Sequence, residues 1–276
     1  MRAPLAPSPL RADTARAGPA LRIQGLGVTF GGVRVLDDLS FDVHAGQIVA
    51  LIGPNGAGKT TVLNCINGFI RPQQGSIRAG GRELLSLPAH ARARLGVGRT
   101  FQDLQLFGSM TVLDNVLVAL HTRIRSGLIR DLLWLPARRE ERRASEHAHA
   151  VLARLGLQEH ARRRADTLSL GQQKLLGVAR CLALDARLLL LDEPAAGLTR
   201  YEATALGEVL RTLPDWHSGG HTAVLLVEHA MDLVMGVSDH VVVLDHGQKL
   251  ADGSPEQVRR SPAVIAAYLG EESAHA

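Results

Sequence analysis

The segment Gly53-Pro-Asn-Gly-Ala-Gly58-Lys59-Thr60 combines residue types that bind phosphate. Its glycines let backbone N–H groups turn inward on phosphate oxygens, and the helix expected to begin at Lys59 adds the positive end of its dipole. Lys59 is placed to reach the β- and γ-phosphates of a nucleotide, and the Thr60 hydroxyl to hold Mg²⁺. Because an apolar strand is expected over residues 47–52, the segment predicts a nucleoside triphosphate site rather than a glycine-rich turn without a ligand.

Two acids follow an aliphatic run later in the chain. The four leucines 188–191 predict a buried strand, and Asp192 and Glu193 come directly after it. Asp192 is then expected at the carboxyl edge of the sheet, where it can bind Mg²⁺ directly or through water, while Glu193 can polarise an attacking water. Alone, a strand followed by a polar turn is common; beside a phosphate loop, it indicates the second half of a phosphoryl-transfer site.

Three more polar residues carry little information one at a time. A glutamine after a strand, such as Gln102, is usually a surface residue. A histidine after an apolar strand, such as His229, is more often a structural contact than a catalyst. Their order along the chain is more informative, because Gln102, Ser169, Asp192 and His229 follow the phosphate loop in that sequence.

Length and composition limit the class of protein. The 276 residues are 46% hydrophobic and 21% charged, which is typical of a globular chain with one large domain or two small ones. No apolar run approaches the ~20 residues of a membrane span, and the first residues lack the layout of a secretory signal. Cys65 and Cys181 are too far apart in the sequence to indicate a disulfide framework or a metal cluster. We therefore expect a cytosolic, reduced chain that does not span a membrane.

The positive charge is concentrated in one stretch. Residues 121–164 contain eleven arginines and five acids, a net charge of +6, whereas the whole chain carries +4. A solvated helical face is the simplest interpretation, and a polyanion or an anionic membrane surface are the alternatives. Trp134 is the only aromatic residue of the stretch, so it lacks the stacking side chains typical of nucleic-acid binding.

Hydrophobic patterning predicts strands alternating with helices at both ends of the chain and helices alone in the middle. Strands are expected at 21–24, 28–30, 41–43, 47–52, 75–78, 96–100, 187–191, 221–227 and 241–244. Helices are expected at 59–67, 111–120 with Thr111 as N-cap, 128–163 with a break at Pro136, 171–184, 201–213, 255–260 and 262–269. This pattern predicts an α/β core with an inserted helical subdomain.

The order of motifs resembles that of the ATP-binding subunits of ABC transporters, over residues 21–269. In that family an aromatic residue stacks on adenine, and Phe30 stands at its position. Gln102, in Arg99-Thr-Phe-Gln, matches the glutamine that reaches Mg²⁺ and the attacking water. His229 matches the histidine that contacts the γ-phosphate. The loop 194–198 matches the loop that follows the catalytic carboxylate.

The resemblance implies a full set of site residues. The catalytic residues are Glu193, His229 and Gln102. The Mg²⁺ ligands are Thr60, Gln102 and Asp192. The nucleotide contacts are Phe30, Gly53, Pro54, Asn55, Gly56, Ala57, Gly58, Lys59, Thr60, Thr61, Ser169, Gly171 and Gln172.

One position departs from the family pattern. The family signature Leu-Ser-Gly-Gly-Gln corresponds to Leu168-Ser-Leu-Gly-Gln172, so Leu170 replaces the first glycine. Close approach of backbone to phosphate favours glycine. In the family the serine and the second glycine carry most of the phosphate contact, and Ser169 and Gly171 are present. We therefore expect a working site; the alternative is a cassette that binds ATP but hydrolyses it weakly.

The resemblance also implies a fold and a division of the chain. The fold is an α/β P-loop NTPase (ABC ATPase) core with a parallel sheet, an N-terminal antiparallel β subdomain and an inserted α-helical subdomain at about 104–168. Residues 21–270 form a single ABC ATPase domain, 1–20 a disordered N-terminal extension and 271–276 a tail.

Within the family, four segments resemble the LivG-like subunits of branched-chain amino-acid importers: 100–116, 130–136, 234–239 and 262–270. Related subunits serve urea and short-chain amides. The resemblance implies a subunit that binds ATP and Mg²⁺, clamps ATP with a second ABC ATPase subunit (a sister subunit or a second copy), and powers import. Two membrane permease subunits would contact residues 104–164, and an extracytoplasmic substrate-binding protein would act indirectly. The chain would lie peripherally on the cytoplasmic face of the membrane.

Other nucleotide-binding classes fit less well. A GTPase would carry an Asn-Lys-x-Asp segment, and no Asn-Lys pair occurs. A small-molecule P-loop kinase would lack the segment 168–172. A non-transport ABC-type ATPase acting on nucleic acid remains as an alternative, although tandem cassettes, zinc motifs and long coiled coils are missing from the sequence, and no nucleic-acid partner is expected. A regulatory cassette that holds ATP as a static ligand is the other alternative.

Overall fold

The computed structural model describes residues 18–100, 105–121, 134–217 and 221–274. Gln102, most of the expected N-terminal extension and the first part of the arginine-rich insert lie outside the described residues.

A parallel sheet forms the centre of the described structure, with strand order β10-β9-β3-β8-β7-β6. Its strands are β3 (Ile48–Ile52), β6 (Val97–Arg99), β7 (Leu188–Asp192), β8 (Ala223–Val227), β9 (His240–Asp245) and the antiparallel edge strand β10 (Gln248–Gly253). Every residue of β3, β7 and β8 is buried, as expected for parallel strands that are covered on both faces. The predicted α/β fold is confirmed.

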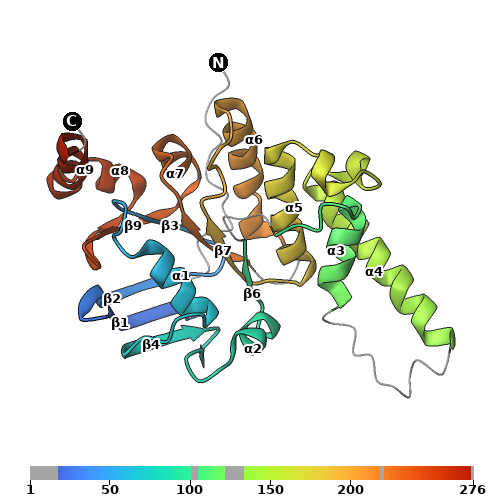
Figure 1. Ribbon diagram of the computed structural model, residues 1–276, viewed down its shortest axis with the longest axis horizontal. Helices are drawn as coiled ribbons and strands as arrows, with labels where there is room; N and C mark the ends of the chain where they lie inside the picture. Colours follow the sequence, from blue (N-terminus) through green and yellow to red (C-terminus); the bar gives the residue numbers. More distant parts are fainter. Residues whose placement is uncertain (1–17, 101–104, 122–133, 218–220, 275–276) are drawn as a thin grey trace.

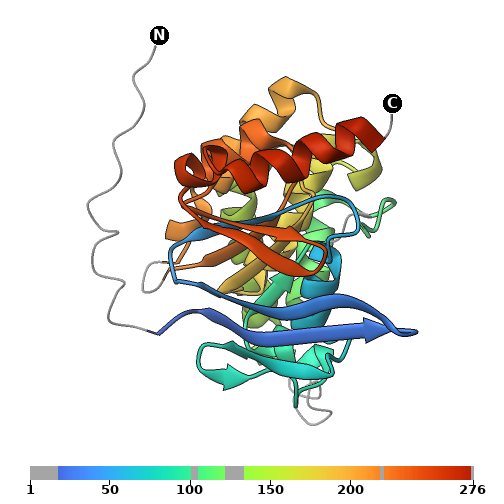
Figure 2. The ribbon, with the colours of Figure 1, turned by 90° about the vertical axis from the view of Figure 1, so that its left-hand side faces the viewer.

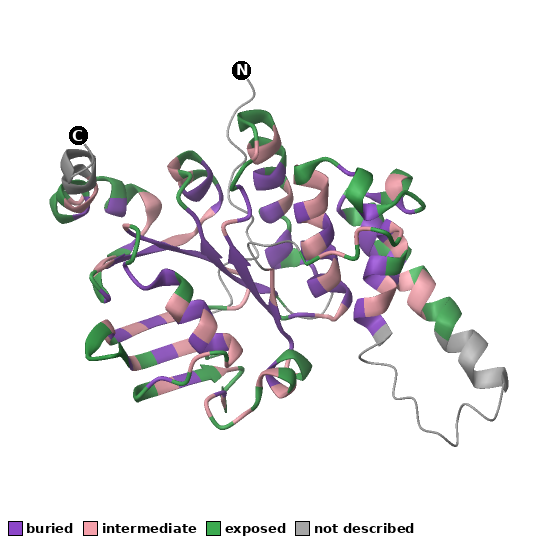
Figure 3. Ribbon diagram, viewed as in Figure 1, coloured by how far each residue is buried: buried purple, intermediate pink, exposed green. Residues whose placement is uncertain are grey.

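Side chains of the central strands alternate between two apolar layers. On β7, Leu189 and Leu191 belong to one layer with residues of α5 (Leu170–Ala183) and α6 (Arg200–Leu210). Leu188 and Leu190 belong to the other, with α1 (Lys59–Asn67) and the N-terminal strands. This is the period of two that a strand imposes on its side chains. Figure 3 shows the buried residues along the sheet and on the inner faces of the helices.

An antiparallel sheet is formed mainly by the N-terminal part of the chain, in the order β2-β1-β4-β5. Its strands are β1 (Leu21–Phe30), β2 (Val33–Val43), β4 (Gln74–Ala79) and β5 (Arg82–Glu83). The two short strands expected before residue 31 form the single strand β1, whose register shifts near Gly25, at φ 60°. Helix α1 lies between the two sheets, and the antiparallel strands run below the parallel sheet in Figure 2. Helix α2 (Ala89–Arg94) was not expected.

The inserted helices α3 (Val112–His121) and α4 (Trp134–Arg154) pack against each other and against α5. Thr111 caps α3 as predicted, because its Oγ1 accepts a hydrogen bond of 3.0 Å from the Asp114 amide. The predicted break at Pro136 is wrong. Pro136 is the third residue of α4, in the first turn, where a missing N–H breaks no intrahelical hydrogen bond. Figure 1 shows α4 extending away from the parallel sheet.

The C-terminal part of the described chain adds α7 (Met231–Val237), α8 (Pro255–Arg259) and α9 (Pro262–Ala274) beside β9 and β10. The hairpin between β9 and β10 turns at His246 and Gly247, both at positive φ. Within the four described ranges, no helix combines the length and the hydropathy needed to cross a membrane.

Candidate nucleotide-binding site

Strand order brings the predicted site residues to one edge of the parallel sheet. Strands β3, β8 and β7 are parallel neighbours, with Leu51 opposite Val227 and Asp192 opposite Val227 on the other side. The carboxyl ends of all three strands therefore meet at one edge. The phosphate loop after β3, the acids at the end of β7 and His229 after β8 lie there for that reason.

The phosphate loop needs glycine at two positions. Gly53 has φ 150°, and a Cβ there would lie 2.0 Å from the carbonyl oxygen of Leu244. Gly58, the N-cap of α1, has φ 102°, and a Cβ there would lie 2.6 Å from a methyl group of Leu36. By contrast, a Cβ at Gly56 would meet no atom within 4 Å. The loop is thus closely packed at both ends and open at its middle.

The Lys59 ammonium lies folded over this loop. Its Nζ donates hydrogen bonds to the carbonyl oxygens of Gly53 (2.6 Å) and Pro54 (2.7 Å), and the residue is 6% exposed. The neighbouring Asn55 and Thr60 are exposed. An open loop with a buried cation at its base fits a phosphate ligand.

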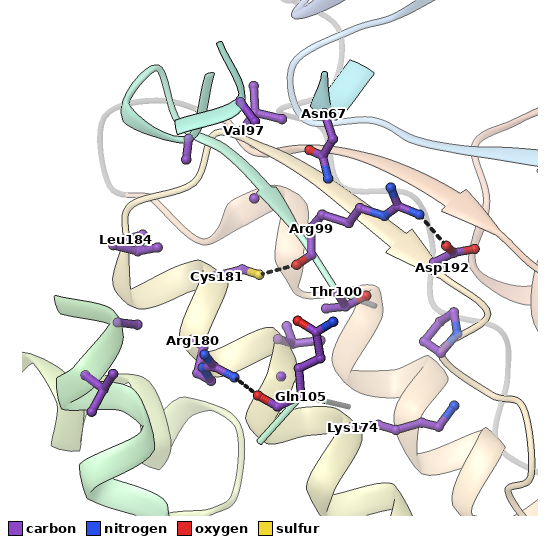
Figure 4. Close-up of a pocket in the computed structure, with 18 of the residues that line it drawn as sticks. Asn67, Val97, Arg99, Thr100, Gln105, Lys174, Arg180, Cys181, Leu184 and Asp192 are labelled. Carbon is purple, nitrogen blue, oxygen red and sulfur yellow. Dashed lines mark hydrogen bonds and ion pairs between the residues drawn. The ribbon is translucent and has the colours of Figure 1, made fainter. Parts of the chain in front are cut away.

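Asp192 is buried and paired. Its Oδ2 lies 2.8 Å from Nη2 of Arg99, on the neighbouring strand β6, and both side chains are more than nine-tenths buried. Figure 4 shows these two side chains pointing toward each other beside a cavity of about 370 Å³, which Thr100 and Lys174 also line. A carboxylate is the ligand type that Mg²⁺ prefers, so the residue predicted as a metal ligand has suitable chemistry.

Glu193 and His229 contact each other. Oε1 of Glu193 lies 3.1 Å from Nε2 of His229, and the side chains are 22% and 42% exposed. Glu193 has φ 47°, an uncommon conformation for a residue other than glycine, and its amide donates to the Val227 oxygen at 2.9 Å. The strained turn directs this carboxylate away from the strand to a place that water reaches. Such an arrangement can accept a proton from an attacking water.

The sequence interpretation missed two buried charges behind this pair. Glu228 accepts hydrogen bonds from the amides of Ala195 (2.6 Å), His229 (2.8 Å) and Ala230 (3.1 Å) and is 3% exposed. Lys174, on α5, donates to the Glu193 carbonyl oxygen at 3.0 Å. Burial lowers the pKa of Lys174, and the charges of Glu228 and Glu193 oppose that shift. A lysine among the apolar residues of a helix was the only sequence signal for this group.

The signature segment begins α5 on the other side of the sheet from α1. Ser169 is the N-cap: its Oγ accepts from the Gln172 amide at 3.3 Å, and its own amide donates to Gln172 Oε1 at 3.1 Å. Leu170 is 39% exposed and lies against Gly197 in the loop after β7. A Cβ at Gly171 would lie 3.5 Å from Glu202 on α6. This segment therefore contacts the loop that follows Glu193.

Phe30 stands apart from that cluster. Phe30 ends β1 and is 47% exposed, beside the turn Gly31-Gly32. Strand β2 continues from that turn to Leu36, which contacts Gly58 of the phosphate loop. Gln102 lies outside the described residues, so the structure gives no position for it.

Sequence-family comparisons match two parts of the chain. A family described as "ABC transporter" matches residues 36–196, and one described as "Branched-chain amino acid ATP-binding cassette transporter" matches residues 248–274. Together these matches include the phosphate loop, the acids after β7 and the C-terminal helices.

Curated relatives resemble the chain over nearly its whole length. It is 47% identical to the high-affinity branched-chain amino acid transport ATP-binding protein LivG of Salmonella typhimurium, over 92% of this chain and 98% of that protein. It is 48% identical to BraF of Pseudomonas aeruginosa, which bears the same description, over the same shares.

Solved structures resemble the fold. The ADP conformation of an ATP-binding cassette of an ABC transporter is 30% identical, with TM-score 0.78 over 91% of this chain and 99% of that one. A nucleotide-free cassette has TM-score 0.76 and 29% identity, over 91% and 98%. The chain therefore belongs to the ABC transporter family of ATP-binding proteins, and it is an ATPase of that family.

Proposed function

We propose that this chain is the ATP-hydrolysing subunit of an importer of branched-chain amino acids or of related amides. Support comes from the printed function of its relatives, branched-chain amino-acid transport, and from the match of residues 248–274 to a family of that name. The described site residues are assigned to nucleotide and Mg²⁺, and none is assigned to the transported molecule. The identity of the substrate therefore rests on these relatives.

Within this proposal, each site residue has a role. Lys59 and the loop 53–61 hold the phosphates of ATP, and Phe30 stacks on adenine. Thr60, Asp192 and Gln102 hold Mg²⁺, which when bound neutralises charge on the phosphates. Ser169, Gly171 and Gln172 contact the γ-phosphate of a nucleotide bound mainly by a second cassette.

The observation that carries the hydrolytic role is the Glu193–His229 contact at the sheet edge shared with the phosphate loop. Glu193 accepts the proton of the attacking water, and His229 holds the carboxylate in place. Lys174 and Glu228 fix the backbone on either side of the pair. Strain at Glu193 persists because these contacts hold the turn.

The signature segment and the phosphate loop begin helices on opposite faces of the sheet. We infer that each signature completes the site of another cassette, so that ATP joins two ABC ATPase subunits and its hydrolysis releases them. The partners would be a sister subunit or a second copy, two membrane permease subunits and, indirectly, an extracytoplasmic binding protein. The assembly would hold the chain peripherally at the cytoplasmic face of the membrane.

The test is Mg²⁺-dependent ATP hydrolysis by the purified chain, wild type beside Glu193→Gln. The variant should lose roughly 10²- to 10⁴-fold in turnover, the usual contribution of a general base, while it still binds ATP. It should also accumulate as an ATP-dependent dimer on gel filtration. Glu208→Gln, on the exposed side of α6, is the matched control and should hydrolyse normally.

Three results would redirect the proposal. A Glu193→Gln protein with normal turnover would remove Glu193 from the catalytic role. ATP binding without turnover in either protein would mean that the signature of a partner is required, and co-purification would follow. Unchanged leucine uptake in cells that lack the chain would contradict the transport role while leaving the ATPase intact.

A further inference from the structure

Arg99 is a buried cation beside the carboxylate proposed to bind metal. Its Nη2 lies 2.8 Å from Oδ2 of Asp192, and the two side chains are 5% and 7% exposed. Arg99 is the last residue of β6, and Asp192 is the last residue of the neighbouring parallel strand β7. The two side chains therefore start from the same edge of the sheet, and Figure 4 shows them pointing toward each other beside the cavity that both line.

A second contact holds the same guanidinium from the side of the phosphate loop. Nη1 of Arg99 donates to Oδ1 of Asn64 at 2.7 Å, and Asn64 lies on α1, the helix that begins at Lys59. The planar guanidinium reaches Asn64 and Asp192 at once, which the single ammonium of a lysine does less well. Arg99 thus links the helix that follows the phosphate loop to the strand that ends in Asp192.

This contact leaves the two oxygens of Asp192 unequal. Oδ2 is engaged by Arg99, whereas Oδ1 accepts no hydrogen bond within the described part of the chain. A cation that approaches Asp192 therefore finds one oxygen available. Mg²⁺ suits such a ligand, because it keeps its own waters and takes single oxygens in a tight octahedron. Ca²⁺ is larger and commonly binds a carboxylate through both oxygens.

We propose that Arg99 is a positioning residue that limits Asp192 to contact through one oxygen and so makes the site prefer Mg²⁺ to Ca²⁺. The inference rests on the proposed function in one respect, the assignment of Asp192 to the metal. Arg99 touches neither nucleotide nor water in this role; it acts through the carboxylate. Removal of the guanidinium frees both oxygens of Asp192 and leaves its buried negative charge uncompensated. Ca²⁺, which can bind both oxygens, then gains more affinity than Mg²⁺, which takes one.

The experiment compares cation preference, not turnover. The affinity for a non-hydrolysable ATP analogue is measured by calorimetry in Mg²⁺ and in Ca²⁺, for wild type, Arg99→Met and Arg99→Lys. The ratio of the Mg²⁺ affinity to the Ca²⁺ affinity should fall about tenfold in Arg99→Met, the usual effect of losing a group that orients a metal ligand. Arg99→Lys should restore part of the ratio, because the charge returns without the link to Asn64.

Arg94→Met is the matched control, because Arg94 is exposed on α2 and makes no ion pair among the described residues. Its ratio should equal that of the wild type. If Arg99→Met fails to fold by circular dichroism, Asn64→Ala replaces it, since it removes the hydrogen bond that anchors the guanidinium to α1. That variant should shift the ratio in the same direction by a smaller factor.

If Arg99→Met weakens binding of the analogue by the same factor in Mg²⁺ and in Ca²⁺, or changes neither affinity, the inference about Arg99 is overturned and the proposed function is untouched. A purely structural role for Arg99 gives the first of these results, because it weakens nucleotide binding whatever the cation. Wild-type affinity that is independent of divalent cations would overturn the assignment of Asp192 to the metal as well as the inference. The two failures are therefore distinguishable.

Discussion

At the scale of single residues, the Lys59 ammonium is held by two carbonyl oxygens of its own loop. We expect Lys59→Ala to weaken ATP binding on the order of 100-fold, because charge-assisted contacts to phosphate are lost. Calorimetric titration with ATP measures this. Lys249→Ala is the control, because its ion pair with Asp252 lies at the surface and contributes little. Normal ATP affinity in Lys59→Ala would contradict the loop assignment.

Glu228 carries a second prediction at this scale. Its carboxylate accepts three backbone N–H groups, so Glu228→Gln replaces one acceptor oxygen by an amide that donates. We expect the free energy of unfolding in urea to fall by roughly 2–3 kcal/mol, the range for hydrogen bonds to a charged group. Glu208→Gln, exposed on α6, should leave it within about 0.5 kcal/mol. If Glu228→Gln lowers the free energy of unfolding no more than Glu208→Gln does, water or a rotated side chain replaces these contacts.

The sequence predicted the residues of the site that belong to local motifs and missed those defined by long-range contacts. Lys59 was predicted from the glycine-rich loop that precedes it, and Asp192 from the apolar strand that it ends. Arg99, Lys174 and Glu228 were not, because their partners lie 93, 19 and 33 positions away in the chain. Hydrogen bonds between segments far apart in the sequence leave no periodic pattern, so only the folded chain reveals these charges.

At the scale of elements, two helices begin with the same capping box. Ser169 and Gln172 cap α5, and Ser254 and Gln257 cap α8. We expect Ser169→Ala and Ser254→Ala each to lower the free energy of unfolding by about 1 kcal/mol, because both lose an N-cap. Only Ser169→Ala should also lower ATP hydrolysis, because only that serine is assigned to phosphate. Urea unfolding and ATPase assays on both variants test this.

The comparison between the two serines separates capping from catalysis. Equal losses of ATPase activity in both variants would mean that stability limits the assay. Normal activity in both would remove Ser169 from the phosphate contacts.

Elements were predicted where a long apolar run or a cap defined them. The buried strands β3, β7 and β8 and the helices α1 and α5 lie within two residues of the expected bounds. The edge strand β10 and the helix α2 were missed, because edge strands and short helices bury few residues and leave weak periodicity. Helix α6 ends at Leu210, earlier than expected, and a short 3₁₀ turn follows at Leu213–Asp215.

At the scale of the whole molecule, the arginine-rich stretch serves in part as a structural element. Arg154, at the end of α4, donates to the Trp216 carbonyl oxygen at 2.7 Å and lies 3.9 Å from the centre of its ring. Arg142 pairs with Glu146 on the exposed side of the same helix, as expected of a solvated face. The net charge of the stretch therefore overstates what its described part offers to an anionic partner.

The two buried cysteines make the stability of the whole fold depend on pH. Burial raises the pKa of Cys65 and of Cys181 to about 12, with Arg92 and Arg180 opposing the shift. The folded protein keeps both protons between pH 9 and 12, whereas the unfolded chain loses them, so stability falls as pH rises through this range and is unaffected below it. The slope is about 1.4 kcal/mol per pH unit for each thiol. Urea unfolding at pH 8, 9 and 10 measures the slope.

The Cys65→Ala/Cys181→Ala variant isolates the contribution of the thiols. It should be less stable at pH 8, because two buried side chains become smaller, yet lose less stability between pH 9 and 10 than the wild type. In the wild type at pH 8, a thiol reagent should modify neither cysteine until urea is added, and then both. Modification of Cys181 in the native state would mean that β6 and α5 separate readily, since Cys181 donates to the Arg99 carbonyl oxygen across that contact. Because Arg99 also holds Asp192, such opening would disturb the proposed metal site from a distance.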